Sequence, residues 1–206
     1  MIQRETVKMS NSIQVESPLH HAQLDQLIGQ SSAGGIVLHE HKLLGHLNLR
    51  GNCADAEFLA GVQEALGVAL PITPCSSAKS ELAQIMWLAP DEWLIIVASG
   101  NEDEVEQKLR SYLTGHFAVS DISGAQTLIE LSGEHVIDLM KKSTGYDLHL
   151  DSFPVGKVVG TTFAKTGAHI LRVSEDSFQL VVRRSFSDYV WLWIQQGSQE
   201  YGLTIV

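Results

Sequence analysis

Residues 84–97 read QIMWLAPDEWLIIV, two apolar runs separated by a short polar turn. Proline and two carboxylates suit a turn at 89–92, because proline presets the backbone and the acids stay in solvent. The second run, 93–97, is apolar on both faces, which is typical of a strand covered on both sides. This stretch therefore predicts a β-hairpin in the interior of a sheet.

The segments on either side of this hairpin complete one structural unit. Strands are expected at 36–40 and 43–49, and a helix is expected over 54–66, where apolar residues recur on one face. A second helix is expected over 101–113, with acidic residues in its first turn, where the helix dipole favours negative charge.

The same order of elements recurs in the second half of the chain. Leu131-Ser132-Gly133 aligns with Leu49-Arg50-Gly51, and Phe178 aligns with Trp93. The strands and helices expected in this half lie at 117–119, 127–131, 134–143, 158–164, 169–173, 178–183 and 185–200.

This recurrence predicts an α+β fold, an internally duplicated β-β-α-β-β-α arrangement with ferredoxin-like halves. We expect a single duplicated domain over 35–206, with a first repeat at 36–114 and a second at 117–201. Residues 1–34 form a polar leader with little periodicity, which we expect to be partly disordered. Within the leader, only a short stretch near 24–28 favours a helix.

Composition limits the partners of the chain. Its 206 residues include 24 acidic and 14 basic side chains, a formal net charge of −10. Because nucleic-acid binding depends on lysine and arginine displacing counterions, we expect neither nucleic acid nor an anionic membrane as partner. The sequence has no apolar run long enough to cross a bilayer and no apolar signal core at its start. Its two cysteines lack metal-ligand spacing, so we predict a cytoplasmic protein with reduced thiols.

Nucleotide-binding motifs are incomplete in this sequence. Gly156-Lys157 resembles the end of a phosphate-binding loop, but Asp151 stands where the first glycine is required. Val158 also replaces the serine or threonine that would hold magnesium. No Gly-x-Gly-x-x-Gly run follows a predicted strand, so a dinucleotide site of that kind is not expected.

Metal and acid–base sites are also poorly supported. His39 and His41 share one face of a predicted strand, whereas His46 points to the opposite face, so the three do not converge as zinc ligands. The acidic pairs Asp91-Glu92 and Glu175-Asp176 fall in predicted turns, where solvated carboxylates are common. The sequence therefore predicts no catalytic, cofactor-binding or metal-ligating residue in this chain.

Two short motifs are similar to those of serine hydrolases. Ser76-Ser77-Ala78-Lys79 and Lys165-Thr166-Gly167 resemble two of the three motifs of penicillin-binding enzymes. The third motif is missing, because Ser120-Asp121 is followed by isoleucine where asparagine is required. We therefore favour a turn at 165–167 over a catalytic site.

The last predicted helix is apolar almost all round between residues 189 and 194. A helix of this kind is usually covered on two sides, either by a second layer of its own domain or by a partner. Tryptophan and arginine are favoured anchors at interfaces, and Arg183-Arg184 precede this helix. We therefore predict a partner interface that includes Arg184 and Trp191, with burial of the tryptophan in its own domain as the alternative.

Several stretches, taken in their order and spacing, carry a resemblance to a known family. They are Leu88-Ala89-Pro90-Asp91-Glu92-Trp93-Leu94, Asp121-Ile122-Ser123-Gly124, Leu131-Ser132-Gly133, Gly145-Tyr146-Asp147-Leu148-His149, Phe153-Pro154-Val155-Gly156, Arg183-Arg184-Ser185-Phe186-Ser187-Asp188-Tyr189-Val190-Trp191 and Glu200-Tyr201-Gly202-Leu203. Together they resemble the gamma subunit of heterotetrameric sarcosine oxidase. Two departures occur in turns: Ser143-Thr144 stands where a glycine-cysteine type of sequence is expected, and Ala89 stands where glycine is usual.

The resemblance implies a fold similar to the folate-binding domain of aminomethyltransferases. It implies a non-catalytic subunit that packs against alpha, beta and delta subunits in a complex that oxidises sarcosine to glycine. Hydrogen peroxide and either formaldehyde or methylenetetrahydrofolate are the further products it implies. FAD, FMN, NAD, zinc and tetrahydrofolate are then expected in the partner subunits and none of them in this chain.

A second function stays open on the sequence alone. A stand-alone folate-binding protein similar to aminomethyltransferases would have the same predicted fold. It would need a buried acid facing a pterin, and residue spacing nominates none. The sequence also leaves open which surface meets which subunit and whether the isolated chain self-associates.

Overall fold

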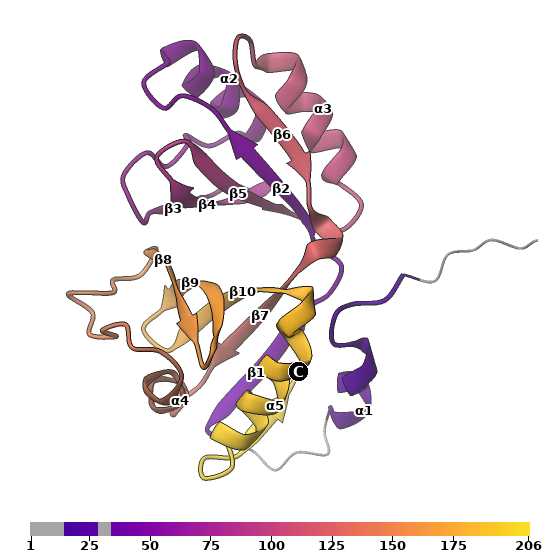
Figure 1. Ribbon diagram of the computed structural model, residues 1–206, viewed down its shortest axis with the longest axis vertical. Helices are drawn as coiled ribbons and strands as arrows, with labels where there is room; N and C mark the ends of the chain where they lie inside the picture. The colour runs from indigo at the N-terminus through magenta and orange to yellow at the C-terminus, as the bar shows by residue number, and fades with distance from the viewer. Residues whose placement is uncertain (1–14, 29–33) are drawn as a thin grey trace, which may run out of the picture.

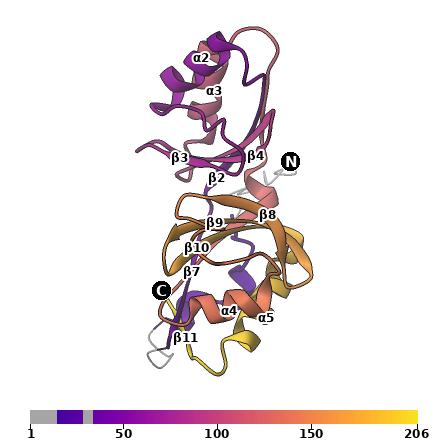
Figure 2. The same ribbon diagram turned by 90° about the vertical axis from the view of Figure 1, so that its left-hand side faces the viewer.

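The computed structural model describes residues 15–28 and 34–206. Two β-sheets lie face to face, and helices cover the outer face of each sheet (Figures 1 and 2). The chain therefore forms four layers in the order helix, sheet, sheet, helix, which confirms the predicted α+β class. In the described ranges, none of the helices combines the length and hydropathy of a membrane-spanning segment.

The five-stranded sheet contains the hairpin predicted from residues 84–97. Helices α2 (Ala56–Leu66) and α3 (Glu102–Tyr112) cover its outer face (Figure 2). Asp55 caps α2 by accepting hydrogen bonds from the amides of Glu57 and Phe58, and Gly67 ends it in the left-handed conformation. The strands run in the order β3 (Ser77–Lys79), β4 (Ala83–Ala89), β5 (Glu92–Val97), β2 (Gly45–Arg50) and β6 (Ala118–Asp121).

The six-stranded sheet is covered by α4 (Val136–Ser143) and α5 (Ser187–Gly197). Strand β11 (Leu203–Ile205) pairs parallel to β1 (Ile36–His41) at one edge of this sheet. Two glycines permit this closure, because a Cβ on Gly34 would lie 2.4 Å from the carbonyl carbon of Gly202. The strands run in the order β11 (Leu203–Ile205), β1 (Ile36–His41), β7 (Gln126–Ser132), β10 (Ser177–Arg183), β9 (Thr166–Ser174) and β8 (Val158–Phe163).

Strand pairing departs from the predicted repeat limits. β1 was expected in the first unit, 36–114, but it lies in the sheet built from the second half. β6 was expected in the second unit, 117–201, but it pairs with β2 in the other sheet. Each sheet therefore follows a β-α-β-β-β-α-β order along the chain, and in the six-stranded sheet β1 is inserted between β7 and β11. The difference arises because apolar periodicity reports which face of a strand is buried and carries no information about its pairing partner. The internal duplication itself stays a prediction.

Three hydrophobic layers hold the elements together. One lies between the five-stranded sheet and its helices, and a second lies between the six-stranded sheet and its helices. The third lies between the sheets and consists of Met86, Leu94, Ile96, Leu128, Val158, Leu171 and Val181. We call this set the inter-sheet layer.

The predicted leader is partly packed onto the fold. Residues 1–14 and 29–33 of this leader lie outside the described residues, so the expected partial disorder stays a prediction. The described part contains η1 (His20–Ala22) and α1 (Leu24–Leu27), and the side chains of Leu19 and Leu24 are buried in the core of the six-stranded sheet. The short helix predicted from the sequence is thus present. Although the leader is mostly polar in composition, this segment packs apolar side chains into the core.

A buried carboxyl fixes this N-terminal segment. Glu40 of β1 is 3% exposed and accepts hydrogen bonds from the Ser17 hydroxyl at 2.8 Å and the Leu19 amide at 3.1 Å. The hydroxyl of Thr127 on β7 donates a third bond at 3.0 Å. Residues 17–19 are therefore tied to the sheet through one side chain.

Candidate functional site

Trp191, one of the two predicted interface residues, lies inside the chain. Its side chain is 5% exposed and belongs to the core between α5 and the six-stranded sheet. A side chain with so little exposed surface contributes little to a partner interface, so the alternative interpretation of Trp191 is correct. The neighbouring Leu192 is the apolar residue of α5 that faces solvent, with 55% of its surface exposed.

Arg184, the other predicted interface residue, is exposed at the start of η3 (Arg184–Phe186). Its guanidinium nitrogens lie 3.4 Å from the carbonyl oxygen of Glu16, and Arg183 beside it is also exposed. Both arginines line an open hollow of about 770 Å³, which we call the arginine trough. Its lining residues are Ile122, Gly124, Ala125, Gln126, Arg183, Arg184 and Ser185.

The arginine trough lies at the junction of the two sheets. Strand β6 of one sheet leads through η2 (Ser123–Ala125) into β7 of the other sheet, and η2 contacts η3. Figure 1 shows this crossing between the upper and lower halves of the molecule. Gln126, the first residue of β7, also lines the hollows on both sides of the trough. Three hollows therefore share Gln126 at this junction.

One of these neighbouring hollows, of about 300 Å³, is lined by three side chains that carry buried polar atoms without partners among the described residues. We call it the His46 pocket, because the His46 side chain that lines it is 2% exposed. Neither ring nitrogen of His46, nor Oε2 of Glu102, nor Oε1 of Gln126 has a hydrogen-bond partner among residues 15–28 and 34–206. Leaving such a group unpaired costs about 1–3 kcal/mol, so an arrangement of this kind needs an explanation.

Burial determines the protonation of His46. Desolvation lowers the pKa of the His46 imidazole from 6.5 to about 4, and the negative charge of Asp121 only partly opposes this effect. The ring is therefore neutral at pH 7, with one nitrogen as donor and the other as acceptor. The backbone of His46 is already satisfied, since its amide donates to the Ser123 hydroxyl and its carbonyl accepts from the Ile122 amide.

The three clustered histidines of the sequence do not converge on one site. Nδ1 of His39 lies 2.8 Å from the carbonyl oxygen of Val206, and Nε2 of His41 lies 2.9 Å from Oε2 of Glu130. The hydrogen bond from His41 is the main reason that the pKa of Glu130 falls to about 2. His46 lies on the other sheet. Within the part of the chain that the structure describes, no three histidine, cysteine or acidic residues are grouped as metal ligands.

A buried arginine that sequence reasoning missed holds two of the stretches that carry the family resemblance. Arg172 of β9 is 3% exposed, and its Nη1 donates to the carbonyls of Leu148 and Phe153 at 2.8 and 3.1 Å. It also donates to the carbonyls of Ser174 and Glu175. The role of Arg172 is thus to position the loop between α4 and β8. An arginine within an otherwise apolar strand was the signal that could have identified it.

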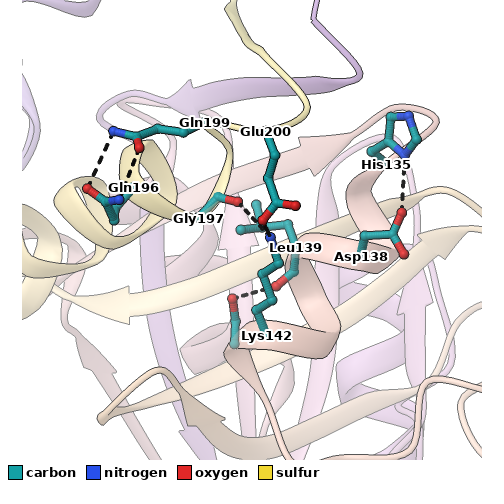
Figure 3. Close-up of polar contacts among 9 residues, drawn as sticks. His135, Asp138, Leu139, Lys142, Gln196, Gly197, Gln199 and Glu200 are labelled. Carbon is teal, nitrogen blue, oxygen red and sulfur yellow. Dashed lines mark hydrogen bonds and ion pairs between the residues drawn. The ribbon is translucent and has the colours of Figure 1, made fainter.

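The polar side chains at the ends of α4 and α5 also pair with one another (Figure 3). Lys142 of α4 reaches across to the Gly197 carbonyl at the end of α5 and to the Glu200 carboxylate beyond it. His135 pairs with Asp138 at 3.1 Å, and its ring stacks on Tyr201. These contacts stabilise the turn that leads into β11. The polar groups on this surface pair with one another, so their role is structural.

The residues of the serine-hydrolase motifs and of the acidic pair Asp91-Glu92 form local contacts that stabilise turns. The Ser76 hydroxyl donates to the carbonyl of Thr73 at 2.6 Å, and a catalytic nucleophile would donate to a general base instead. Asp91 lies in the β4–β5 turn and pairs with Arg50 at 2.9 Å, and Glu92 accepts from Asn48 at 2.8 Å. Lys165 lies in the β8–β9 turn, although Thr166 already begins β9. A catalytic constellation is therefore not built from these residues.

Comparison with known proteins agrees with the resemblance drawn from the sequence. The model of the "Sarcosine oxidase, gamma subunit family" matches residues 50–200. Sarcosine oxidase subunit gamma of Corynebacterium sp. (strain P-1) is 30% identical over 187 residues, which cover 90% of each chain. The corresponding subunit of Arthrobacter sp. is 30% identical over 188 residues, with the same coverage.

Solved structures share the fold. A chain of the heterotetrameric sarcosine oxidase from Corynebacterium sp. U-96 aligns with a TM-score of 0.81 and 24% identity, over 90% of this chain and 95% of that one. Aminomethyltransferase T of the glycine cleavage system from Bartonella henselae aligns with a TM-score of 0.66 and 13% identity, over 92% and 58%. The predicted likeness to aminomethyltransferases is thus confirmed at the level of fold. From the family match and the relatives, this chain belongs to the sarcosine oxidase gamma subunit family.

Proposed function

We propose that this chain is the gamma subunit of a heterotetrameric sarcosine oxidase. The observation that carries the proposal is the match to subunit gamma at 30% identity over 90% of both chains. The complex would oxidise sarcosine to glycine, with hydrogen peroxide and formaldehyde or methylenetetrahydrofolate as further products. Within it the gamma subunit serves as a non-catalytic, structural component.

The partners in this proposal are the alpha, beta and delta subunits. FAD, FMN, NAD, zinc and tetrahydrofolate would be bound by those chains, as the family resemblance implies. Cys53 and Cys75 are free thiols, which supports a reducing compartment such as the cytoplasm.

The experiment is coexpression of this chain, carrying an affinity tag, with the neighbouring oxidase genes. We expect the larger chains to copurify with the tag and the eluate to release hydrogen peroxide from sarcosine. Purification of the tagged chain alone would contradict the proposal. Titration of the isolated chain with tetrahydrofolate distinguishes the alternative function, because saturable heat release would favour a stand-alone folate-binding protein.

Arg184 stays our candidate for the partner interface. It is exposed, it lies beside Arg183 at the arginine trough, and arginine is a common anchor of interfaces. We expect Arg184→Ala to weaken subunit association by about 1 kcal/mol or more. The matched control is Arg50→Ala, because Arg50 is an exposed arginine of the other sheet that pairs only with the exposed Asp91 at the β4–β5 turn.

A further inference from the structure

The accessible charges at the sheet junction include those of Arg183 and Arg184, which line the arginine trough. The unpaired atoms of His46, Glu102 and Gln126 have almost no accessible surface, so a molecule in the hollow beside the trough cannot contact them. The two arginines, in contrast, are exposed residues. Recognition of a partner at this junction therefore depends on their guanidinium groups.

Neither arginine of the trough pairs with a carboxylate of the described chain. Arg50 and Arg110 each form an ion pair with an acid, and the buried Arg172 donates to four backbone carbonyls. The Arg184 guanidinium contacts one backbone carbonyl at 3.4 Å, and the Arg183 side chain forms no hydrogen bond or ion pair with the described residues. Although acids outnumber bases by 24 to 14 in this chain, both guanidinium groups thus remain available to an acid from outside.

The trough lies at the edge of the inter-sheet layer. Arg183 of β10 follows Val181 by two positions, and Gln126 of β7 precedes Leu128 by two positions. Because side chains two apart on a strand share a face, Arg183 and Gln126 face the same way as this layer. Ile122, which also lines the trough, packs against the layer. The trough therefore combines an apolar side chain of the inter-sheet layer with two positively charged side chains.

The charge of the trough is opposite to that of the chain as a whole. The formal net charge of the chain is −10, whereas the described residues that line the trough include two arginines and no acid. A carboxylate is therefore attracted here and repelled by the chain as a whole, which favours one position for an acidic partner. Arginine binds a carboxylate through two parallel N–H donors, so it fixes the orientation of the acid as well.

An exposed aromatic ring adjoins the arginines. Phe186 is 44% exposed and lines the neighbouring hollow together with Arg183. Aromatic residues and arginine are enriched at interfaces between proteins. The trough itself, at about 770 Å³, is within the range of about 300–1,000 Å³ in which sites bury molecules larger than a single ion. A chain segment with both acidic and apolar side chains fits these features better than an isolated anion does.

We propose that the arginine trough binds an acidic segment of a partner subunit, whose carboxylates pair with Arg183 and Arg184 and whose apolar side chains pack against Ile122 and Phe186. The inference rests on the proposed gamma-subunit function. It adds to that function the chemistry of the partner at this surface and a second arginine, Arg183, that recognises it.

The first test lets two versions of this chain compete for the larger subunits. Wild-type chain and Arg183→Glu are coexpressed with the oxidase genes, a tag on the largest subunit isolates the complexes, and mass spectrometry compares the ratio of the two chains there with their ratio in the lysate. We expect Arg183→Glu to be at least about tenfold under-represented in the complexes, because the reversed charge repels the carboxylates of the partner.

A matched control and a folding control accompany this variant. Arg50→Glu reverses an exposed arginine of the other sheet and should compete equally with the wild-type chain. Isolated Arg183→Glu should keep the wild-type midpoint of urea denaturation, because the Arg183 side chain is exposed and unpaired among the described residues.

The second test identifies the acid of the partner without reversing a charge. Arg183→Lys and Arg184→Lys keep the positive charge and supply a primary amine, which a water-soluble carbodiimide joins to a carboxylate in contact with it. In the assembled complex we expect mass spectrometry to find position 183 or 184 joined by an amide bond to an aspartate or glutamate of a partner subunit. Arg50→Lys, treated in the same way, should be joined only to acids of this chain.

The inference is overturned if Arg183→Glu keeps its fold and competes as well as the wild-type chain. It is also overturned if positions 183 and 184 are joined only to acids of this chain or of a second copy of it, and this result decides the question if Arg183→Glu does not fold. Neither result affects the gamma-subunit function, because the wild-type chain still copurifies with the larger subunits. If the wild-type chain itself is absent from the complexes, the gamma-subunit function is wrong and the inference is wrong with it.

Discussion

The sequence around Trp191 is compatible with two roles for its side chain, a partner interface and the core of its own domain. On a helix that is apolar almost all round, the tryptophan could face a partner or its own core. In the structure the indole packs against the six-stranded sheet, while Leu192 beside it faces solvent. The neighbours of Trp191 thus come from strands distant in sequence, which a helical pattern does not identify.

Replacing Trp191 with alanine should reduce the free energy of unfolding by about 3–5 kcal/mol, because it empties a large buried volume. Leu192→Ala, on the exposed side of the same helix, should change it by no more than about 0.5 kcal/mol. Urea denaturation of the isolated chain measures both. A Trp191→Ala chain of unchanged stability that no longer assembles with its partners would restore the interface interpretation.

His46 predicts a specific acid sensitivity. Its pKa is about 4 in the folded chain and 6.5 as an unperturbed group, so between these values the unfolded state binds more protons. Stability is therefore fully present above pH 6.5 and should fall as the pH drops toward 4, by at most about 1.4 kcal/mol per pH unit.

The measurement is the free energy of unfolding against pH for the wild-type chain and His46→Gln. The variant should have a shallower slope between pH 6.5 and 4. His149→Gln, an exposed histidine paired with Asp151, is the control and should keep the wild-type slope. Equal slopes in all three chains would contradict the assignment of this effect to His46.

Among the elements, the segment 15–28 depends most on a single side chain. Glu40 accepts three hydrogen bonds, two of them from residues 17–19, and Leu19 and Leu24 pack beneath. Glu40→Ala should cost about 2–4 kcal/mol, because the buried donors lose their shared acceptor. Hydrogen exchange of residues 17–27 should then accelerate more than that of β10.

The control for this prediction is Glu64→Ala, which removes an exposed acid from α2. It should leave the exchange of residues 17–27 unchanged. Uniform acceleration across all strands in Glu40→Ala would show that the carboxyl stabilises the whole fold and does not act on this segment in particular.

The whole molecule is joined by the inter-sheet layer and by polar links across it. The amide of Gln84 on β4 donates to Gln179 on β10 at 2.8 Å, and Gln179 in turn donates to Glu130 at 3.0 Å. Chain crossings at 42–44 and 122–125 connect the same two sheets. Because the crossings and the shared core couple the sheets, we expect them to unfold together.

Met86→Ala tests this coupling from the five-stranded side. Met86 is fully buried in the inter-sheet layer, so its truncation should cost about 2–5 kcal/mol. Hydrogen-exchange protection should fall in β10 as well as in β5, although Met86 lies in β4. Loss of protection confined to the five-stranded sheet would mean that the sheets unfold independently.

A large part of the fold could be read from local patterns. The hairpin at β4 and β5, the four main helices and the α+β class follow from apolar periodicity, caps and turn residues, which act over a few neighbouring positions. The family also followed, because its motifs are ordered stretches of sequence. The candidate site did not follow, since Glu102 and Gln126 belong to no motif and line the same hollow as His46 only in the folded chain.

Local residue chemistry alone was therefore enough to establish the elements of this protein, their order and its family. The exchange of β1 and β6 between the sheets, the burial of Trp191 and the unpaired atoms around His46 all required the folded chain. The physical reason is that pairing, burial and desolvation depend on which distant segments come into contact. A residue's own neighbours in the sequence do not specify those contacts.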